Sequence, residues 1–225
     1  MKIEMHAHTS EVSPCSHITA ASLVQTYAGL GYDVLMITDH FNDYVLEAYR
    51  GCTPTEAVDR YLEGYRRALE EAERWGIRVW LGVECCLQGG KHRGEWNDFL
   101  FYGIDREFLL DHPRLYSLTQ KEAFLEAESA GILMYQAHPF RYYCTPQDPE
   151  YMHGAEVYNG QPCANNNEKA LKWAKKHGLR QSAGSDCHRA EYAGIAGIIV
   201  PDYLRDEKAL AAYMRDHAPE LVMKR

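Results

Sequence analysis

The sequence predicts an α/β fold built on a largely parallel sheet whose strands are joined by helical crossovers. Short apolar runs, typical of buried strands, alternate along the chain with longer amphipathic segments. Helix-capping residues and glycines mark the ends of those amphipathic segments. The 225 residues contain no internal repeat, low-complexity run or linker, so we expect one domain spanning residues 1–225.

The first half of the chain is expected to contain four strands and two helices. Thr19 is a suitable N-cap for the first helix and Gly31 a suitable stop, while Gly76 ends the second, strongly amphipathic helix. The intervening apolar runs are too short for helices. The expected strands are residues 3–6, 33–38, 77–84 and 99–104, and the expected helices are residues 19–30 and 55–75.

The second half continues the alternation with three helices and four strands. Thr119 and Glu122 form a capping-box pattern, and Gly131 and Gly178 follow the first two helices. The expected helices are residues 119–130, 165–177 and 206–216, and the expected strands are residues 132–137, 156–158, 181–183 and 195–200. Two stretches without a clear period, residues 41–54 and 144–154, are expected to be loops or short helices over a site.

Composition and charge argue against several classes of protein. Hydrophobic residues make up 46% of the chain, which excludes a mostly disordered protein. A formal net charge of -8 argues against a nucleic-acid partner. No apolar run reaches the roughly 18 residues of a membrane span, and the first residues lack a signal-peptide pattern, so we expect no membrane partner and a cytoplasmic protein. No feature of the sequence defines an oligomeric state.

Histidine, aspartate and glutamate, the residue types that commonly bind metals, lie at or just after the ends of five expected strands. In parallel α/β sheets and barrels, the carboxyl ends of the strands meet at one edge, where active sites lie. Five such coincidences in one chain favour a common metal site. The residues are His6 and His8, Asp39 and His40, Glu84, His138, and Asp186 and His188.

The spacing within two of these groups has a geometric meaning. Alternate residues of an extended chain point the same way, so His6 and His8 can face one ion, as can Asp186 and His188. Imidazole and carboxylate together suit zinc, manganese or iron better than calcium. A shared carboxylate such as Glu84 can bridge two ions.

Six motifs in the chain together resemble the PHP (polymerase and histidinol phosphatase) family. They are HAH at 6–8, CSH at 15–17, TDH at 38–40, GVE at 82–84, AHP at 137–139 and GSDCH at 184–188. They appear in the family's order and span nearly the whole chain. The resemblance implies a distorted (β/α)7 barrel, similar to a TIM barrel, with two or three divalent metal ions at the carboxyl ends of the strands. It also implies phosphoester hydrolysis.

Carried over position by position, the resemblance implies three metal positions. The first is held by His6, His8, Glu84 and Asp186; the second shares Glu84 and adds His138; the third is held by His17, His40 and His188.

Two of these positions depart from the family pattern or are ambiguous. Asp98 stands where the family usually has a second histidine for the second metal, with His112 as the alternative. Glu11, Cys15 and His17 are all candidates for the early ligand of the third metal, and His17 fits the family's C-x-H form best.

The mechanism expected from such a site is metal-ion catalysis. Two ions would lower the pKa of a bridging water from 15.7 toward about 7, which gives a hydroxide for attack on phosphorus. Asp186 is expected to orient this nucleophile or accept its proton, and His188 or His40 to act as general acid toward the leaving group.

Cations and polar groups near the motifs are candidates for substrate binding. Arg141 follows the HPF turn and Arg189 follows the SDCH motif, and a guanidinium suits a phosphate group. Lys91 and Arg93 lie in a glycine-rich segment that would make a mobile lid. Asn159 is a candidate substrate contact, or else a turn residue before Gly160.

Three functions are compatible with these patterns. The first is a phosphomonoesterase or phosphodiesterase for a small phosphorylated metabolite, such as histidinol phosphate or a nucleotide phosphate. The second is an amidohydrolase-like enzyme for C–N bonds or lactones, because barrel metal sites support both chemistries. The third is a non-catalytic metal-binding domain, against which the nearly complete ligand set counts.

Overall fold

The structure is a computed structural model that describes residues 1–88, 96–163 and 165–224. Its strands are β1 (Lys2–Glu4), β2 (Val34–Ile37), β3 (Arg78–Cys86), β4 (Asp98–Tyr102), β5 (Leu133–Gln136), β6 (Gly154–Asn159), β7 (Arg180–Gly184), β8 (Ala196–Ile199) and β9 (Glu220–Met223). Its α-helices are α1 (Ala20–Gly29), α2 (Asp43–Glu47), α3 (Pro54–Tyr61), α4 (Glu63–Trp75), α5 (Arg106–Asp111), α6 (Gln120–Ser129), α7 (Asn167–Lys176) and α8 (Glu207–Asp216).

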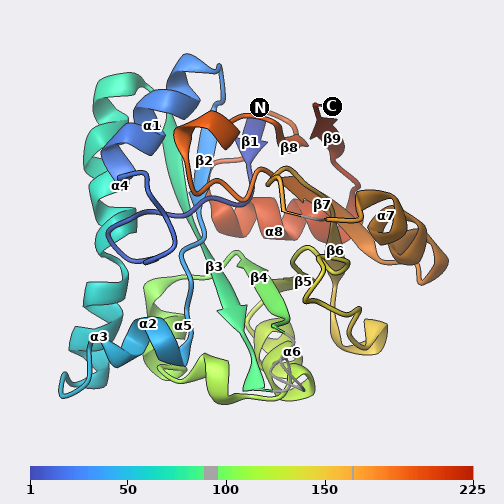
Figure 1. The fold of residues 1–225 in the computed structure, drawn as a ribbon, viewed down its shortest axis with the longest axis horizontal. Helices are drawn as coiled ribbons and strands as arrows, with labels where there is room; N and C mark the ends of the chain where they lie inside the picture. Colours follow the sequence, from blue (N-terminus) through green and yellow to red (C-terminus); the bar gives the residue numbers. More distant parts are fainter. Residues whose placement is uncertain (89–95, 164, 225) are drawn as a thin grey trace.

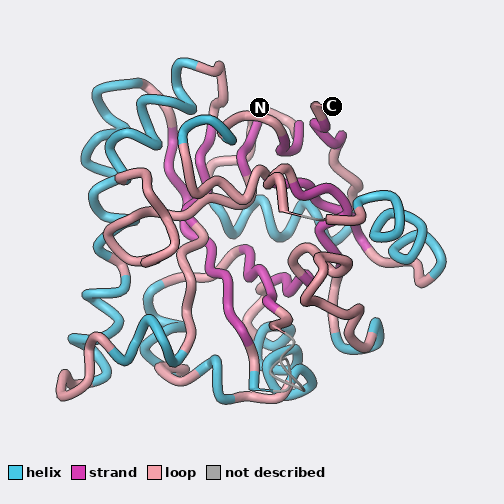
Figure 2. The backbone as a smooth tube through the Cα atoms, viewed as in Figure 1, coloured by secondary structure: helices cyan, strands magenta, loops and turns pink. Residues whose placement is uncertain are grey.

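The strands form a nearly closed barrel. Their order in the sheet is β7-β6-β5-β4-β3-β2-β1-β8-β9. Just beyond the ends of β1 and β7, Ala7 and Cys187 form a parallel bridge, in which the His8 amide donates to the Cys187 carbonyl at 3.1 Å. This bridge joins the two edges of the seven-strand set, and helices surround the strands (Figures 1 and 2). The expected distorted (β/α)7 barrel is confirmed, with β8 and β9 added beside β1.

One strand runs against the others of the barrel. β4 pairs antiparallel with both β3 and β5, whereas β1, β2 and β3 pair in parallel, as do β5, β6 and β7. Cys86 at the end of β3 is therefore opposite Asp98 at the start of β4. As a result, the first residue of β4 lies at the same edge as the last residues of the parallel strands.

The expected helix over residues 55–75 is two helices, which meet at Leu62. α3 begins with a complete capping box between Thr53 and Glu56. α4 starts with Gly64 pressed against the loop after β1, because a Cβ at Gly64 would lie 2.1 Å from the Thr9 hydroxyl oxygen. The strand β9 was not expected from the sequence.

Apolar side chains fill the barrel below its mouth. Ile3, Met36, Trp80 and Leu100 belong to one buried cluster that also includes Met214 of α8. α1 and α4 pack over the outside of β2 and β3 through a second cluster. None of the helices in the described part of the chain is long and apolar enough to cross a bilayer.

Candidate metal centre

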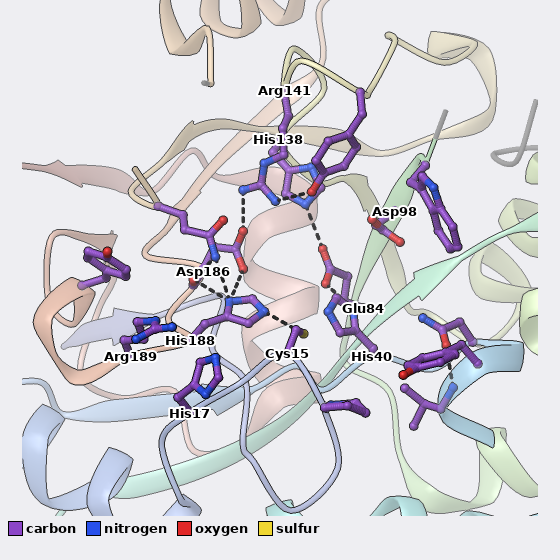
Figure 3. Close-up of a pocket in the computed structure, with 18 of the residues that line it drawn as sticks. Cys15, His17, His40, Glu84, Asp98, His138, Arg141, Asp186, His188 and Arg189 are labelled. Atoms are coloured by element: carbon purple, nitrogen blue, oxygen red, sulfur yellow. Dashed lines mark hydrogen bonds and ion pairs between the residues drawn. The ribbon is translucent and has the colours of Figure 1, made fainter. Parts of the chain in front are cut away.

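A cavity of about 760 Å³ opens at the mouth of the barrel, at the carboxyl ends of the parallel strands. Histidines and carboxylates from separate strand ends point into it (Figure 3). The residues predicted from the sequence that line it are His17, His40, Glu84, Asp98, His138, Arg141, Asp186, His188 and Arg189. His6 and His8 lie beneath them, fully buried.

Glu84 lies between four imidazoles. One of its oxygens, Oε1, is 3.2 Å from His6 Nε2 and 3.0 Å from His138 Nε2. The other oxygen, Oε2, is 3.4 Å from His8 Nε2 and 2.8 Å from His40 Nδ1. A carboxylate whose two oxygens face different pairs of nitrogens is placed to bridge two cations.

The two carboxylate oxygens of Asp186 face different partners. Oδ1 is 3.5 Å from His6 Nε2 and 3.3 Å from His8 Nε2. Oδ2 accepts hydrogen bonds from Arg141 Nη2 at 2.5 Å and Asn159 Nδ2 at 3.2 Å. The arginine and the amide therefore fix the carboxylate with Oδ1 turned toward the histidines.

The surroundings of both central carboxylates shift their pKa values toward the ionised form that cation binding needs. Burial by itself would raise the pKa of Asp186, but His6 and Arg141 hold it well below its usual range. Burial opposes ionisation of Glu84 too, and His6 and His40 hold the pKa of Glu84 well below its usual range.

Five buried side-chain atoms in this cluster form no hydrogen bond of good geometry among the described residues, although two of them, His40 Nδ1 and Glu84 Oε2, lie 2.8 Å apart. A buried polar atom without a partner costs about 1–3 kcal/mol, and such atoms usually mark a function or a missing ion. Here they lie next to one another, and nitrogen and carboxylate oxygen are suitable donors for a divalent cation. The residues present thus fit metal ions. The atoms are His6 Nε2, His8 Nε2, His40 Nδ1, Glu84 Oε2 and Asp186 Oδ1.

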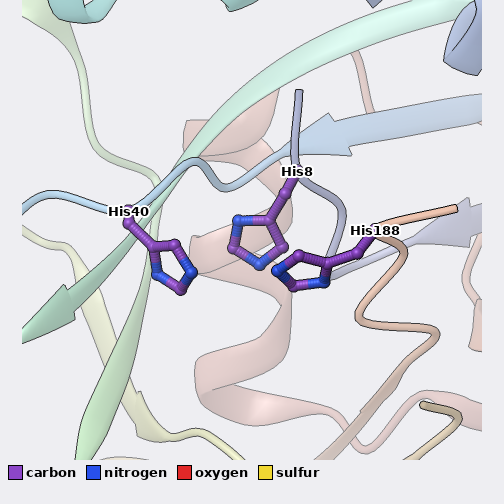
Figure 4. Close-up of side chains that lie close together, drawn as sticks. All are labelled: His8, His40 and His188. Atoms are coloured by element: carbon purple, nitrogen blue, oxygen red, sulfur yellow. The ribbon is translucent and has the colours of Figure 1, made fainter. Parts of the chain in front are cut away.

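The described residues contain three groups whose ligand atoms lie within 4.8 Å of one another. They are His6, His8 and Asp186; Glu84, Asp98 and His138; and His8, His40 and His188. The first group contains three of the four residues expected at the first position, without Glu84, and the second contains the residues expected at the second position. In the third, shown in Figure 4, His8 joins His40 and His188, and His17 is absent.

Backbone strain concentrates at two of these residues. His138 has φ 29° and Asp186 has φ 51°, and they are the only non-glycine residues with positive φ in the part of the chain that the structure describes. Such conformations cost about 1–3 kcal/mol each and persist where the surroundings impose them. The Glu156 carboxylate accepts the His138 amide at 3.0 Å, which helps to hold this turn.

Glu156 holds His6 and the backbone of His138 in place through its two carboxylate oxygens. The sequence analysis did not identify it as a functional residue. Its Oε1 is 2.9 Å from His6 Nδ1, which leaves His6 Nε2 free to face Glu84 and Asp186. A carboxylate on the outer nitrogen is the usual way in which proteins orient a metal-binding histidine. An acidic residue within the buried strand β6 was the available signal.

Asp39 is buried but belongs to none of the three groups. It accepts hydrogen bonds from the Thr9 amide and the Ser13 hydroxyl, both at 2.7 Å. Ser13 Oγ in turn accepts the His40 amide at 3.1 Å. Burial raises the pKa of Asp39 to about 6, although the bonds from Thr9 and Ser13 lower it. Asp39 therefore ties the loop after β1 to the loop after β2.

The structure brings Asp98, and not His112, to the second group. Asp98 is buried beside Glu84, and burial raises its pKa. His112 lies at the end of α5, where its ring stacks on Phe108 with centroids 4.3 Å apart. The glycine-rich segment with Lys91 and Arg93 lies outside the described residues.

Cys15 and His17 both reach the rim of the cavity on the loop after β1 (Figure 3). The His17 side chain is exposed, and its amide donates to the His188 carbonyl at 2.8 Å. The Cys15 sulfur lies 3.2 Å from His188 Nε2. Burial by itself would raise the pKa of the Cys15 thiol, but hydrogen bonds and charge from His188 and His40 lower it to about 6.

The residues predicted to bind substrate differ in exposure. Arg141 is 5% exposed, and besides Asp186 it donates to the side chains of Asn165, Tyr143 and Asn159. Asn159 is also buried, and it links Arg141 to Asp186 and Glu156. Arg189 is exposed at the rim of the cavity.

Known proteins share this fold. A family model described as PHP-associated matches residues 164–218. No curated protein sequence is significantly similar to the chain. The full chain superimposes, with a TM-score of 0.68 and 19% identity, on 65% of a two-domain protein from Bacteroides vulgatus containing a predicted PHP-like metal-dependent phosphoesterase. The chain has the PHP-type fold.

Two further solved structures are similar to the chain in fold. An amidohydrolase from Chromobacterium violaceum with bound sulfate has a TM-score of 0.60 and 17% identity, with 95% of this chain and 97% of that chain covered. The lesion-specific endonuclease EndoQ from Pyrococcus furiosus has a TM-score of 0.63 and 14% identity, with 98% of this chain and 57% of that chain covered. The chain thus spans less than two thirds of the Bacteroides and Pyrococcus proteins.

Proposed function

We propose that the protein is a metal-dependent hydrolase that cleaves the phosphoester of a small phosphorylated metabolite. The observation that carries this proposal is the set of unpartnered nitrogen and oxygen atoms that converge around Glu84 and Asp186 in an open cavity. The PHP-like phosphoesterase in the Bacteroides protein, which shares the fold, supports it.

Two or three divalent ions, of zinc, manganese or iron, fit the donors present. When bound, they would acidify a water molecule and neutralise charge on the phosphoryl oxygens. The residues that would hold them are His6, His8, His40, Glu84, Asp98, His138, Asp186 and His188, and His17 was also expected from the sequence.

The chain's own groups would orient the reaction. Asp186 faces the centre with Oδ1 while Arg141 neutralises Oδ2, which weakens this carboxylate as a base. We therefore assign Asp186 to orienting the attacking water. When only two ions are bound and the third position is empty, His188 or His40 would protonate the departing oxygen. Both imidazoles lie at the edge of the cluster that opens to the cavity.

The rim of the cavity would select the substrate. Arg189 is exposed there and is placed to hold a phosphate oxygen, whereas the donors of Arg141 are already bound to protein groups. Exposed aromatic side chains also line the cavity, with Tyr44 at 69% and Tyr142 at 76% exposure. Aromatic side chains of this kind stack on planar groups, so we propose a phosphate ester that carries a ring.

A second candidate is hydrolysis of a C–N bond or lactone by the same centre. The observation that favours it is the shared fold with the Chromobacterium amidohydrolase, although the sulfate bound in that protein is also a mimic of phosphate. The Pyrococcus endonuclease adds nucleic acid as a possible substrate, which the net charge of -8 disfavours.

The test is phosphate release from a panel of phosphomonoesters by protein loaded with manganese or zinc. We expect release that requires the metal and that falls by at least about 100-fold in His138→Ala. His112→Ala is the matched control, because His112 was the alternative ligand but caps the end of α5 and is not among the residues that line the cavity; it should keep the parental rate. Turnover only of amides or lactones would replace the phosphoesterase proposal with the second candidate.

A further inference from the structure

We propose that the thiolate of Cys15 is a ligand of the ion held by His40 and His188, which makes this position a mixed nitrogen and sulfur site. The inference rests on the metal-binding part of the proposed function but not on the reaction. It starts from one contact, the 3.2 Å between Cys15 Sγ and His188 Nε2.

His188 has only one nitrogen available for an ion. Its Nδ1 lies 3.0 Å from both Gln161 Nε2 and the Asp186 carbonyl oxygen, which occupy that side of the ring. Nε2 is left on the other side, where Cys15 lies (Figure 3). An ion bound to His188 through Nε2 must therefore lie beside the Cys15 sulfur.

A second observation points independently to a ligand at this place. His40 Nδ1 is a buried atom without a hydrogen bond among the described residues, and the ligand atoms of His40 and His188 lie within 4.8 Å of each other. His8 belongs to the same group, but its Nε2 also faces Asp186 in the first group and can bind only one ion. Figure 4 shows these three rings turned toward one another, with centroids of His8 only 4.4 Å from His40 and 4.3 Å from His188.

The distance between sulfur and nitrogen fits a shared ion. Zinc–sulfur and zinc–nitrogen bonds of about 2.3 and 2.0–2.1 Å place two such ligands about 3.5 Å apart in a tetrahedral site. The observed 3.2 Å is within a few tenths of an ångström of that value. The thiol needs only a small rotation to share the ion with His188.

The loop that carries Cys15 is anchored on both sides of it. Ser16 Oγ donates to the His8 carbonyl at 2.9 Å, and the His17 amide donates to the His188 carbonyl at 2.8 Å. These bonds tie the loop to the two strand ends that supply the histidine ligands. The exposed His17 ring makes no hydrogen bond within the described residues. His17 therefore contributes to the site through its backbone amide, which anchors the loop to His188.

A thiolate changes which metal this position prefers. Sulfur ligands favour zinc strongly over manganese, whereas the second group, with two carboxylates and one imidazole, is a harder site. The chain would accordingly bind zinc at the Cys15 position even where manganese occupies the others. The exposed thiol of Cys15 would also make the metal centre sensitive to thiol reagents.

The test is the absorption spectrum of the cobalt(II)-substituted protein. A cobalt–thiolate bond gives an intense sulfur-to-metal charge-transfer band in the near ultraviolet, which nitrogen and oxygen ligands do not give. We expect the band in the parent protein and in His17→Ala, and its loss in Cys15→Ser. Cys52→Ser is the matched control, since Cys52 lies in the turn after α2 and is not among the residues that line the cavity.

A second measurement needs no substitution. Bound zinc should slow alkylation of Cys15, located by peptide mass, by at least about tenfold, because a coordinated sulfur is a poor nucleophile. No charge-transfer band, a band that survives in Cys15→Ser, or alkylation unaffected by zinc would overturn the inference. None of these readouts depends on turnover, so a protein inactive on phosphoesters can still give the band, and an active one can lack it.

Discussion

At the scale of single residues, the centre depends on groups that hold its ligands as much as on the ligands. Asp186 has a positive φ and a carboxylate fixed by Arg141 and Asn159. His6 is turned by Glu156 through its outer nitrogen. Strained or constrained ligands of this kind are expected where a site must be formed before its metal arrives.

The two arginines near the centre are expected to act differently. Arg141→Ala should lower metal affinity by about 10–100-fold, because Asp186 loses the contact that orients it. Arg189→Ala should raise KM and leave the metal content unchanged, because Arg189 is exposed at the rim. Metal titration and steady-state kinetics on both variants make the comparison. An Arg141→Ala protein with normal metal affinity and only a raised KM would reverse the assignment.

The aspartate in the second group is expected to set its metal preference. Asp98 supplies an oxygen donor where a histidine would supply nitrogen, and oxygen donors favour a harder ion such as manganese. Asp98→His should therefore shift the preference of the protein toward zinc. Metal content after equilibration with equal manganese and zinc measures this, and a ratio equal to that of the parent would argue that Asp98 is not a ligand.

At the scale of elements, the positions of the strand ends were predictable but their pairing was not. Local patterns located strand ends at His6 and Glu84 and shortly before His40 and Asp186, because apolar runs stop there. The reversed direction of β4 depends on partners distant in sequence, and no local period encodes it. For the same reason the sequence located Asp98 but did not reveal that an antiparallel strand brings it to the mouth.

The division of the expected helix 55–75 also came from tertiary contact. Periodicity continues through Leu62, but Gly64 packs against the Thr9 hydroxyl and the Asp39 carboxylate, which organise the loops of the site. Local sequence gives no signal for this contact, except that a glycine in a helix interior usually has a packing reason.

Gly64→Ala tests the contact between α4 and those loops. The new methyl group would lie 2.1 Å from Thr9 Oγ1, so we expect a loss of about 1–3 kcal/mol in the free energy of unfolding, as for an overpacked core. Gly29→Ala in α1 is the matched control, because no atom lies within 4 Å of the added carbon; it should be neutral or stabilising. Denaturant unfolding compares them, and equal stability would show that the contact is loose.

At the scale of the whole molecule, the barrel brings together residues separated by almost the full chain. The bridge between Ala7 and Cys187 places the HAH and SDCH motifs side by side, which makes one centre from the two ends of the sequence. The resemblance to a known family predicted this closure, whereas periodicity predicted only an α/β class. The network around Glu156 and the position of Cys15 emerged only from the three-dimensional arrangement.

The most direct test is the metal content of the purified chain after equilibration with zinc and dialysis, measured by mass spectrometry beside Glu84→Gln. Glu84 faces all the histidines of the first two groups, so its variant should lose most of the bound ions. The three ligand groups predict two to three ions per chain in the parent protein. A parent that retains no zinc, or a Glu84→Gln variant that retains as much as the parent, would contradict the assignment of a metal centre to the mouth of the barrel.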